Sequence, residues 1–204
     1  MSSSQVRLRT PNGAGMKSTS FHRISLVNPD PAFVREDATA KSIAFFAKVR
    51  PVFVDRAIYD ELKQISISRG NKNVRLCLHS APEDNQHDMI ILERKGTLYR
   101  PHRHPGKAET FHVVEGRMAV FNFDAKGEPA EVGVVHPGEI YRLDLKHYHT
   151  VMPLDDFVIY HEAKVGPFLG DDDFIFPPWG PRAGDDAAMR EFFARCNGLL
   201  GSDA

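Results

Sequence analysis

Two histidines and a glutamate stand close together near the middle of this sequence. His102 and His104 are separated by one residue, and Glu109 follows after a Pro-Gly turn. On a β-strand, residues i and i+2 point to the same face, so both imidazoles project together and Glu109 starts the next strand within their reach. Imidazole nitrogens and a carboxylate oxygen suit one divalent transition metal (Fe, Mn, Ni or Zn) and leave positions open for water or substrate. The pattern predicts a metal site.

A third nitrogen ligand is expected from the segment "HYHTVMP", which offers His147 and His149. His149 is favoured because "HTVMP" continues as a strand with His149 and Val151 on one face, and His147 is the alternative. Nine of the ten histidines fall between His79 and His161, and such clustering is typical of a functional site.

Short β-branched and aromatic runs fill residues 73–163, and turn signals rich in Gly, Pro and Asp separate them. One of these runs, residues 97–104, is the expected strand that carries the first two histidines. Many short strands at regular spacing are typical of a sandwich or small barrel. The predicted fold class is mainly β: a single small antiparallel β-barrel or jelly roll with an N-terminal helical extension and a C-terminal helix.

The chain is expected to divide into four parts. Residues 1–20 are rich in Ser, Gly, Thr and Pro, which predicts a disordered tail. An N-terminal extension is expected over residues 21–70, the barrel over residues 71–182 and a closing helix over residues 183–204.

Two helices are expected in the extension. A short one is expected within residues 35–51, with Ile43, Phe46 and Ala47 on one face. A second is expected over residues 55–68, where apolar residues recur at helical spacing after the candidate N-cap Asp55.

Composition excludes several classes of protein. A net charge of −1 over 204 residues, without runs of Lys or Arg, provides no electrostatic footprint for nucleic acid. Two cysteines outside any CxxC pattern are too few for a disulfide scaffold. The start of the chain has no apolar signal-peptide core, and no window approaches the roughly 18 apolar residues of a membrane span. We expect a soluble cytoplasmic protein with a small-molecule ligand and neither nucleic-acid nor membrane partners.

The ligand spacing resembles the first motif of the cupin superfamily. The match consists of two glycines that frame the three candidate ligands: Gly96, five residues, His102-x-His104, four residues, Glu109, six residues and Gly116.

The segment "PGEIYRLDLKHYHTV" is similar to a stretched second cupin motif, with Pro137-Gly138 ahead of His149. Here the histidine lies unusually far from Pro-Gly, and the asparagine that often follows is absent. The resemblance implies a small antiparallel barrel with one metal bound by three histidines and a glutamate, and it assigns these roles to His102, His104, Glu109 and His149. Cupins commonly pair, so it also implies a homodimer.

A narrower resemblance covers roughly residues 52–182. "RLCLHSAPEDNQHDMIILERKGTLYRPHRHPGKAETFHVVEG", then "YHTVMPLDDFVIYHEAKVGPF" and "PPWGP", resemble the WbuC family of small cupin-fold metalloproteins. Genes of that family are often found among those for lipopolysaccharide O-antigen synthesis. The resemblance therefore implies a carbohydrate-related ligand, while the first fifty residues lie outside it.

Other side chains are candidates for substrate chemistry. Arg100, two residues before His102, is the best candidate among nearby cations to attract an anionic substrate. Tyr160 is a candidate hydrogen-bond donor at the barrel mouth. His79 ends an apolar strand and either lines the cavity or is a core histidine. His112 alternates away from Glu109 and is expected to pack.

Two functions follow from these residues. The first is a metal-dependent enzyme of cupin type, an oxygenase or an isomerase, in which His161 or Glu162 moves a proton. The alternative is a non-catalytic cupin whose metal completes a small-molecule receptor, with a sugar as the expected ligand.

Overall fold

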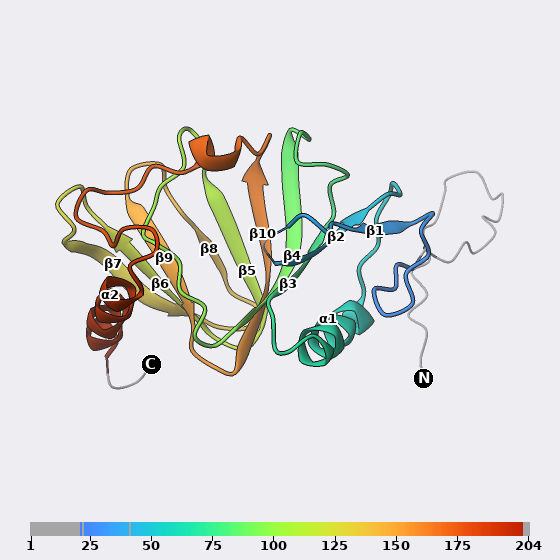
Figure 1. Ribbon diagram of the computed structural model, residues 1–204, viewed down its shortest axis with the longest axis horizontal. Helices are drawn as coiled ribbons and strands as arrows, with labels where there is room; N and C mark the ends of the chain where they lie inside the picture. The colour runs from blue at the N-terminus through green and yellow to red at the C-terminus, as the bar shows by residue number, and fades with distance from the viewer. Residues whose placement is uncertain (1–20, 22, 41, 202–204) are drawn as a thin grey trace, which may run out of the picture.

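Two β-sheets facing each other make up most of the molecule (Figure 1). The computed structural model describes residues 21, 23–40 and 42–201, so the expected tail 1–20 lies outside them. The seven-stranded sheet has the order β1-β2-β3-β4-β10-β5-β8 and the three-stranded sheet the order β7-β6-β9. The pairs are antiparallel except β2–β3, which is parallel. The mainly β fold class predicted from the sequence is confirmed.

The bounds of the strands and helices follow the chain order. The strands are β1 Val34–Glu36, β2 Ile43–Ala47, β3 Val74–Cys77, β4 Gln86–Arg94, β5 Glu109–Glu115, β6 Met118–Phe123, β7 Pro129–Val135, β8 Ile140–Arg142, β9 Tyr148–Pro153 and β10 Phe157–Val165. The helices are α1 Arg56–Ser68, the short 3-10 helix η1 Gly170–Asp173 and α2 Asp186–Leu199.

The short helix expected within residues 35–51 is wrong, because this segment forms β1 and β2. β2 lies beside β3, and its residues from Ala44 to Ala47 are all buried. Phe45 packs in the cluster under α1, whereas Phe46 points to the opposite face of the sheet. A run that is apolar on both faces is compatible with a helix and with a strand that is covered on both sides. Pairing with the neighbouring strand β3 makes this run a strand.

Helix α1 covers the outer face of the larger sheet (Figure 1). Asp55 caps it by accepting a hydrogen bond from the backbone N–H of Ala57 at 3.0 Å. Its buried residues Ile58, Leu62 and Ile65 pack on β2, β3 and β4. This packing buries the apolar side chains on one face of the sheet, so the other face can line an interior space.

Helix α2 packs on the outer face of the three-stranded sheet. Phe192, Phe193 and Cys196 are buried against Phe121 and Phe123 of β6. Asp185 caps the helix through the N–H of Ala188 at 2.9 Å. No helix among the described residues is long and apolar enough to cross a membrane.

The inner face of the larger sheet carries an ordered set of side chains. Across β5, β10 and β4 the register aligns Glu109 with Lys164 and His87 in one row. The remaining rows, read in the same direction, are Phe111–Glu162–Met89–Cys77 and Val113–Tyr160–Ile91–Arg75. Alternation along each strand therefore brings ionisable groups from four strands to one face.

Gly116 closes the turn between β5 and β6 in a conformation that requires glycine. Its φ is +77°, and a Cβ there would lie 2.3 Å from the carbonyl oxygen of Phe157. Gly138 has a similar φ of +88° but nothing within 4 Å of an added Cβ. A side chain at Gly138 would thus meet backbone strain alone, whereas one at Gly116 would meet both backbone strain and a steric clash.

Replacing Gly116 by Ala should lower the free energy of unfolding by about 3 kcal/mol, because strain and overpacking add. Gly138→Ala is the matched control and should lower it by about 1 kcal/mol. Urea denaturation followed by circular dichroism measures both. Equal losses in the two variants would contradict the close approach of Gly116 to β10.

Candidate metal centre

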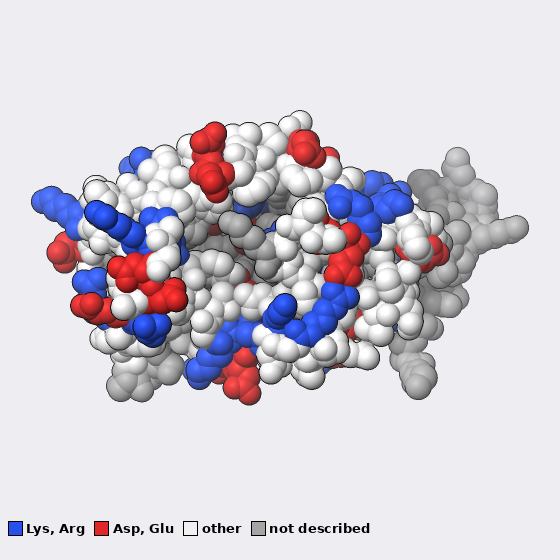
Figure 2. All heavy atoms as spheres, viewed as in Figure 1, with Lys and Arg blue, Asp and Glu red and all other residues white. Residues whose placement is uncertain are grey.

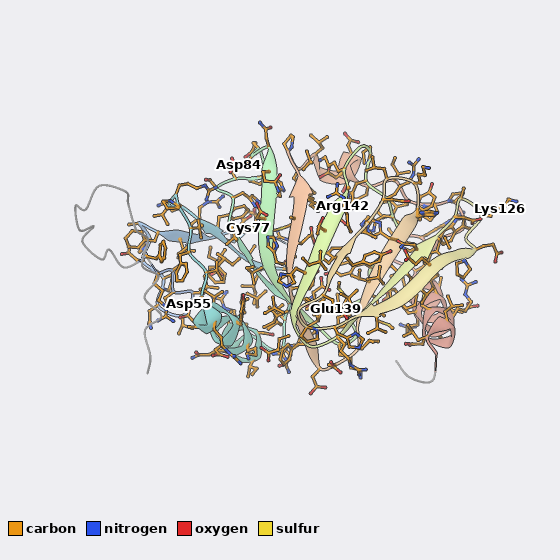
Figure 3. All side chains as sticks on the ribbon, turned by 180° about the vertical axis from the view of Figure 1, so that it is seen from behind. Asp55, Cys77, Asp84, Lys126, Glu139 and Arg142 are labelled. Atoms are coloured by element: carbon orange, nitrogen blue, oxygen red, sulfur yellow. The ribbon has the colours of Figure 1, made fainter. Side chains whose placement is uncertain are left out.

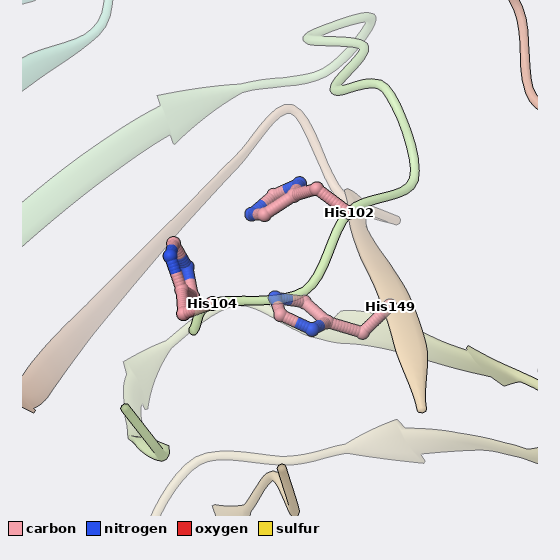
Figure 4. Close-up of side chains that lie close together, drawn as sticks. All are labelled: His102, His104 and His149. Atoms are coloured by element: carbon pink, nitrogen blue, oxygen red, sulfur yellow. The ribbon is translucent and has the colours of Figure 1, made fainter. Parts of the chain in front are cut away.

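Three histidines converge between the two sheets (Figure 4). His102, His104 and His149 each offer a ring nitrogen, and these atoms all lie within 4.8 Å of one another. The ring centroids are 5.0 Å apart for His102–His104 and 4.6 Å for His102–His149. His149 comes from β9, whereas the other two come from the segment between β4 and β5.

Residues 97–104 do not form the regular strand expected from the sequence. The backbone of His102 pairs with His149 in an isolated bridge, and Arg103 pairs with Ile175 in another. His102 N donates to His149 O at 3.0 Å and His149 N donates to His102 O at 2.8 Å. This reciprocal pairing, rather than strand alternation, brings the two imidazoles together.

Backbone carbonyls fix the orientation of two of the imidazoles. Nδ1 of His102 lies 2.8 Å from Arg100 O, and Nδ1 of His104 lies 2.6 Å from Asp173 O. A carbonyl only accepts, so Nδ1 carries the proton in both rings and Nε2 of the neutral ring has a free lone pair. Burial first, and then the neighbouring His149, lowers the pKa of His102 to about 3, which keeps it neutral.

Glu109 completes this arrangement from β5. Its Oε1 lies 2.9 Å from His104 Nε2 and its Oε2 lies 3.2 Å from His149 Nε2. The first contact is not aligned as a hydrogen bond, and His104 Nε2 is a buried atom without a hydrogen-bond partner. A lone pair and a carboxylate face each other, and a cation bound to both relieves their repulsion.

Lys164 holds Glu109 in its charged form. Its Nζ lies 3.1 Å from Glu109 Oε1 and 3.1 Å from Glu162 Oε1. Burial alone would raise the pKa of Glu109, but the ammonium of Lys164 keeps it well below its ordinary value. The centre therefore offers imidazole nitrogens and one carboxylate, which is the donor set of a divalent transition metal.

The centre lies at a cavity of about 320 Å³ between the sheets. Figure 2 shows the molecule hollowed near the middle of this face, with acidic and basic side chains mixed around it. Apolar side chains such as Phe46, Met89 and Phe111 share the lining with the ionisable groups. Such a mixed lining with a few convergent polar groups is typical of a small-molecule site.

A segment after β10 packs against the histidines and lines one side of the cavity. Phe174 packs edge-on against His102, with ring centroids 5.1 Å apart, and Asp173 supplies the carbonyl that holds His104. Lys107 pairs with the buried carboxylate of Asp173 and also donates to Pro167 O. Lys107 therefore holds this segment against the histidines.

A second polar cluster in the cavity was missed by the sequence analysis. Glu93 is fully buried, and its Oε1 accepts from Tyr99 at 2.6 Å and from Tyr160 at 2.9 Å, while its Oε2 has no partner. Burial raises the pKa of Glu93 to about 7. The signal was present in the period-two run His87, Met89, Ile91, Glu93, which puts an acid on the inner face of an otherwise apolar strand.

Some predicted site residues line the cavity. Tyr160 does so, with its hydroxyl donating to Glu93. Glu162 is on the same wall of β10, bonded to Lys164. His79 also lines it, stacked on His87 with centroids 4.0 Å apart, and burial followed by the charge of His87 lowers the pKa of His79 to about 4.

The structure does not bring the other predicted residues to the cavity. His161 lies on the opposite face of β10, where its Nε2 is 3.1 Å from Asp88 Oδ1, because it alternates with Tyr160 and Glu162. Arg100 turns outward, donates to Pro181 O at 2.8 Å and stacks on Phe176. His147 pairs with Asp144 at 2.9 Å on the surface, so it is His149 that joins the other two histidines.

Comparisons with known proteins do not identify a function. Residues 54–134 match a family model described as a domain of unknown function (DUF6016). No curated protein matches this chain.

Several solved structures are similar over about half of the chain. A cupin superfamily protein from Desulfitobacterium hafniense is 8% identical over 47% of this chain and 78% of its own, with a TM-score of 0.38. KdgF from Halomonas sp. is 16% identical over 46% and 79%, also with a TM-score of 0.38. Procruciferin, the 11S globulin from Brassica napus, is 13% identical over 41% of this chain but only 21% of its own, with a TM-score of 0.37. Similarity with TM-scores this low supports no conclusion about the activity of this chain.

Lys107→Met should lower the free energy of unfolding by about 3 kcal/mol, because it leaves the Asp173 carboxylate buried and unpaired. The double variant Lys107→Met with Asp173→Leu should recover much of this loss, since both charges are then gone. Denaturant unfolding measures these differences. Lys126→Met, at an exposed loop labelled in Figure 3, is the control and should change stability by less than about 0.5 kcal/mol. A double variant less stable than Lys107→Met would contradict this view of the pair.

Proposed function

We propose that this chain is a metal-binding cupin and a metal-dependent enzyme that acts on a small molecule in the cavity between its sheets. His102, His104, His149 and Glu109 would hold one divalent transition metal. The observation that carries the proposal is the convergence of His104 Nε2, a buried atom without a hydrogen-bond partner, on the carboxylate of Glu109. Three imidazole nitrogens and one carboxylate oxygen fill part of a metal's coordination sphere and leave positions for a substrate.

When bound, such a metal supplies Lewis-acid polarisation of a substrate oxygen or, as Fe, redox chemistry with dioxygen. The chain's own residues do the rest. Glu162 Oε1 accepts from Lys164, so Oε2 is the atom placed to take a proton from a substrate. Between the two bases expected from the sequence, the cavity therefore favours Glu162 over His161.

Phe174 and the segment around it limit the entry of water to the metal centre. The ring packs against both His102 and His104, and Asp173 fixes His104 from the same segment. A partly buried and partly apolar site strengthens the electrostatic interactions inside it. The residues of this segment thus orient the ligands and exclude solvent at the same time.

The resemblance to the WbuC family extends the proposal to a carbohydrate-related substrate in lipopolysaccharide O-antigen metabolism. A homodimeric, cytoplasmic protein is part of the same proposal. These points depend on the sequence resemblance. The size of the cavity and its ionisable lining support a small polar substrate. The alternative of a non-catalytic receptor for a sugar-like ligand uses the same metal and the same cavity. Metal-dependent turnover of any sugar or enediol-like compound would exclude it.

Protein purified without added metal should contain about one transition-metal ion per chain by elemental analysis. His104→Ala should reduce the metal content to a tenth or less, because it removes a ligand whose orientation is fixed by Asp173. The metal should also raise the midpoint of thermal unfolding of the native protein, but not that of the variant.

His112→Ala is the matched control, because His112 is on β5 like Glu109 but on the opposite face. It should keep the full metal content. Native protein without metal, also after incubation with Fe, Mn, Ni or Zn, would refute the proposal.

A further inference from the structure

Unpaired polar atoms gather in the cavity. Among the described residues, four buried side-chain nitrogen or oxygen atoms have no hydrogen-bond partner, and three of them belong to residues that line the cavity: His104 Nε2, Glu93 Oε2 and Arg75 Nε. Buried polar groups without partners are rare in folded proteins, and each calls for an explanation. The metal explains the first; Arg75 and Glu93 remain.

Arg75 is placed on the inner face of the sheet by the register of β3. It pairs with Ile91 of β4, which in turn pairs with Tyr160 of β10. Its next inward neighbour on β3 is Cys77, which Figure 3 labels. The guanidinium makes a long hydrogen bond of 3.5 Å from Nη1 to Ser42 Oγ, and it also contacts the thiol of Cys77. Its Nε has no partner, so Arg75 is held in the cavity wall by weak polar contacts alone.

The charges around the cavity leave Arg75 uncompensated. Lys164 is neutralised by Glu109 and Glu162, each 3.1 Å away. Arg75 makes no ion pair within the described residues. The charge of Arg75 lowers the pKa of Asp37, but less than the hydrogen bonds from Thr39 and the charge of Arg35 do. A partly buried guanidinium without an anion is unfavourable in the empty cavity, and an anionic ligand removes that penalty.

We propose that Arg75 binds the carboxylate of an elongated, largely apolar monocarboxylic acid, the other end of which reaches the metal centre. This inference rests on the proposed metal-dependent function, but it assigns the cavity a substrate class different from the carbohydrate that the WbuC resemblance implies. A single guanidinium matches one planar carboxylate through paired N–H donors. A phosphate dianion fits less well, because Glu162 and Glu93 line the same cavity and only one unpaired cation faces them.

The shape of the acid follows from the sheet. Glu109 and Arg75 are three strands and four residues apart, which corresponds to about 20 Å along the sheet surface. The side chain of Arg75 and the curvature of the sheet shorten this gap, but one ligand touching both ends must still be extended. Its middle faces Met89, Ile91 and Phe111, which favours a hydrocarbon body. Glu93 Oε2 is placed to contact a hydroxyl group on it.

The test uses probes with a metal-binding hydroxamate at one end and a carboxylate at the other. Adipic and suberic monohydroxamates give a shorter and a longer probe for the span between the metal centre and Arg75. Each is compared with the analogue in which a carboxamide replaces the carboxylate. Calorimetry on metal-loaded native protein should show the carboxylate of the better-fitting length binding about tenfold to 100-fold tighter than its amide. Arg75→Gln should abolish this preference and leave the binding of the amide unchanged.

Arg142→Gln is the matched control. Arg142 is a strand arginine of the same sheet, labelled in Figure 3, with an equally long hydrogen bond of 3.4 Å to Thr110, but it is exposed and outside the cavity. It should keep the full preference for the carboxylate. Equal binding of acid and amide to the native protein, or a preference that survives Arg75→Gln, would overturn the proposal. If the hydroxamates still bound in that case, the proposed metal centre would stand.

Failure of the metal centre is distinguishable from failure of this subsite. Octanoate and octanamide contain no chelating group, and metal-stripped protein should still prefer octanoate in an Arg75-dependent manner. If the native protein bound no metal but kept this preference, the proposed function would fail and the carboxylate subsite would stand.

Stability gives an independent readout. If Arg75 serves a ligand rather than the fold, Arg75→Gln should leave the thermal midpoint of the ligand-free protein unchanged or raise it, because an unpaired charge is removed. A large drop would assign Arg75 a structural role and overturn the proposal. Should Arg75→Gln not yield folded protein, Arg75→Lys keeps the charge and should keep part of the preference for the carboxylate.

Discussion

The hydrogen bonds from two imidazoles to backbone carbonyls are the constraint on which the site depends. Arg100 O and Asp173 O each take an Nδ1–H, so the Nε2 lone pairs of His102 and His104 point inward. One acceptor is local in sequence, whereas the other comes from the segment that follows β10. The ligand geometry is therefore complete only when this late segment has folded onto the barrel. Lys107 secures it there by pairing with Asp173.

The division of labour between the faces of the larger sheet explains how ionisable groups can gather inside a small protein. Helix α1 buries Ile58, Leu62 and Ile65 on the outer face and so supplies apolar burial away from the cavity. The inner face then tolerates Glu93, Glu162 and Lys164, because each of them is hydrogen-bonded or ion-paired with a neighbouring side chain. Ser42 and Phe46 show that the N-terminal extension contributes directly to the cavity wall. The extension is thus part of the site and not an appendage.

The sequence predicted the parts of the structure that depend on local pattern. The helix after Asp55 follows from apolar residues at helical spacing, and the inward direction of Glu109 follows from alternation on β5. Residues 35–51 were mistaken for a helix because an apolar run such as "IAFFA" has no unambiguous period. Arg100 was expected at the site because it precedes His102 by two residues, and His161 because it ends an apolar run. An outward turn before His102 and alternation on β10 direct them elsewhere. Contacts between distant segments, such as that of His104 with Asp173, leave no local signal.

Arg75 and Glu93 illustrate why a binding pocket resists prediction more than a metal site does. Metal ligands are few, chemically distinctive and often close in sequence, so spacing reveals them. A pocket for an organic ligand is made of residues whose partners are supplied by the ligand itself, and in the sequence they look like any arginine or glutamate on a strand. In the folded chain they become visible as donors and acceptors left unsatisfied beside an apolar wall. Folding tolerates this loss because α1 and α2 bury apolar surface elsewhere. The same unsatisfied groups make an empty cavity less stable than a filled one, so the free energy withheld from folding is available for binding.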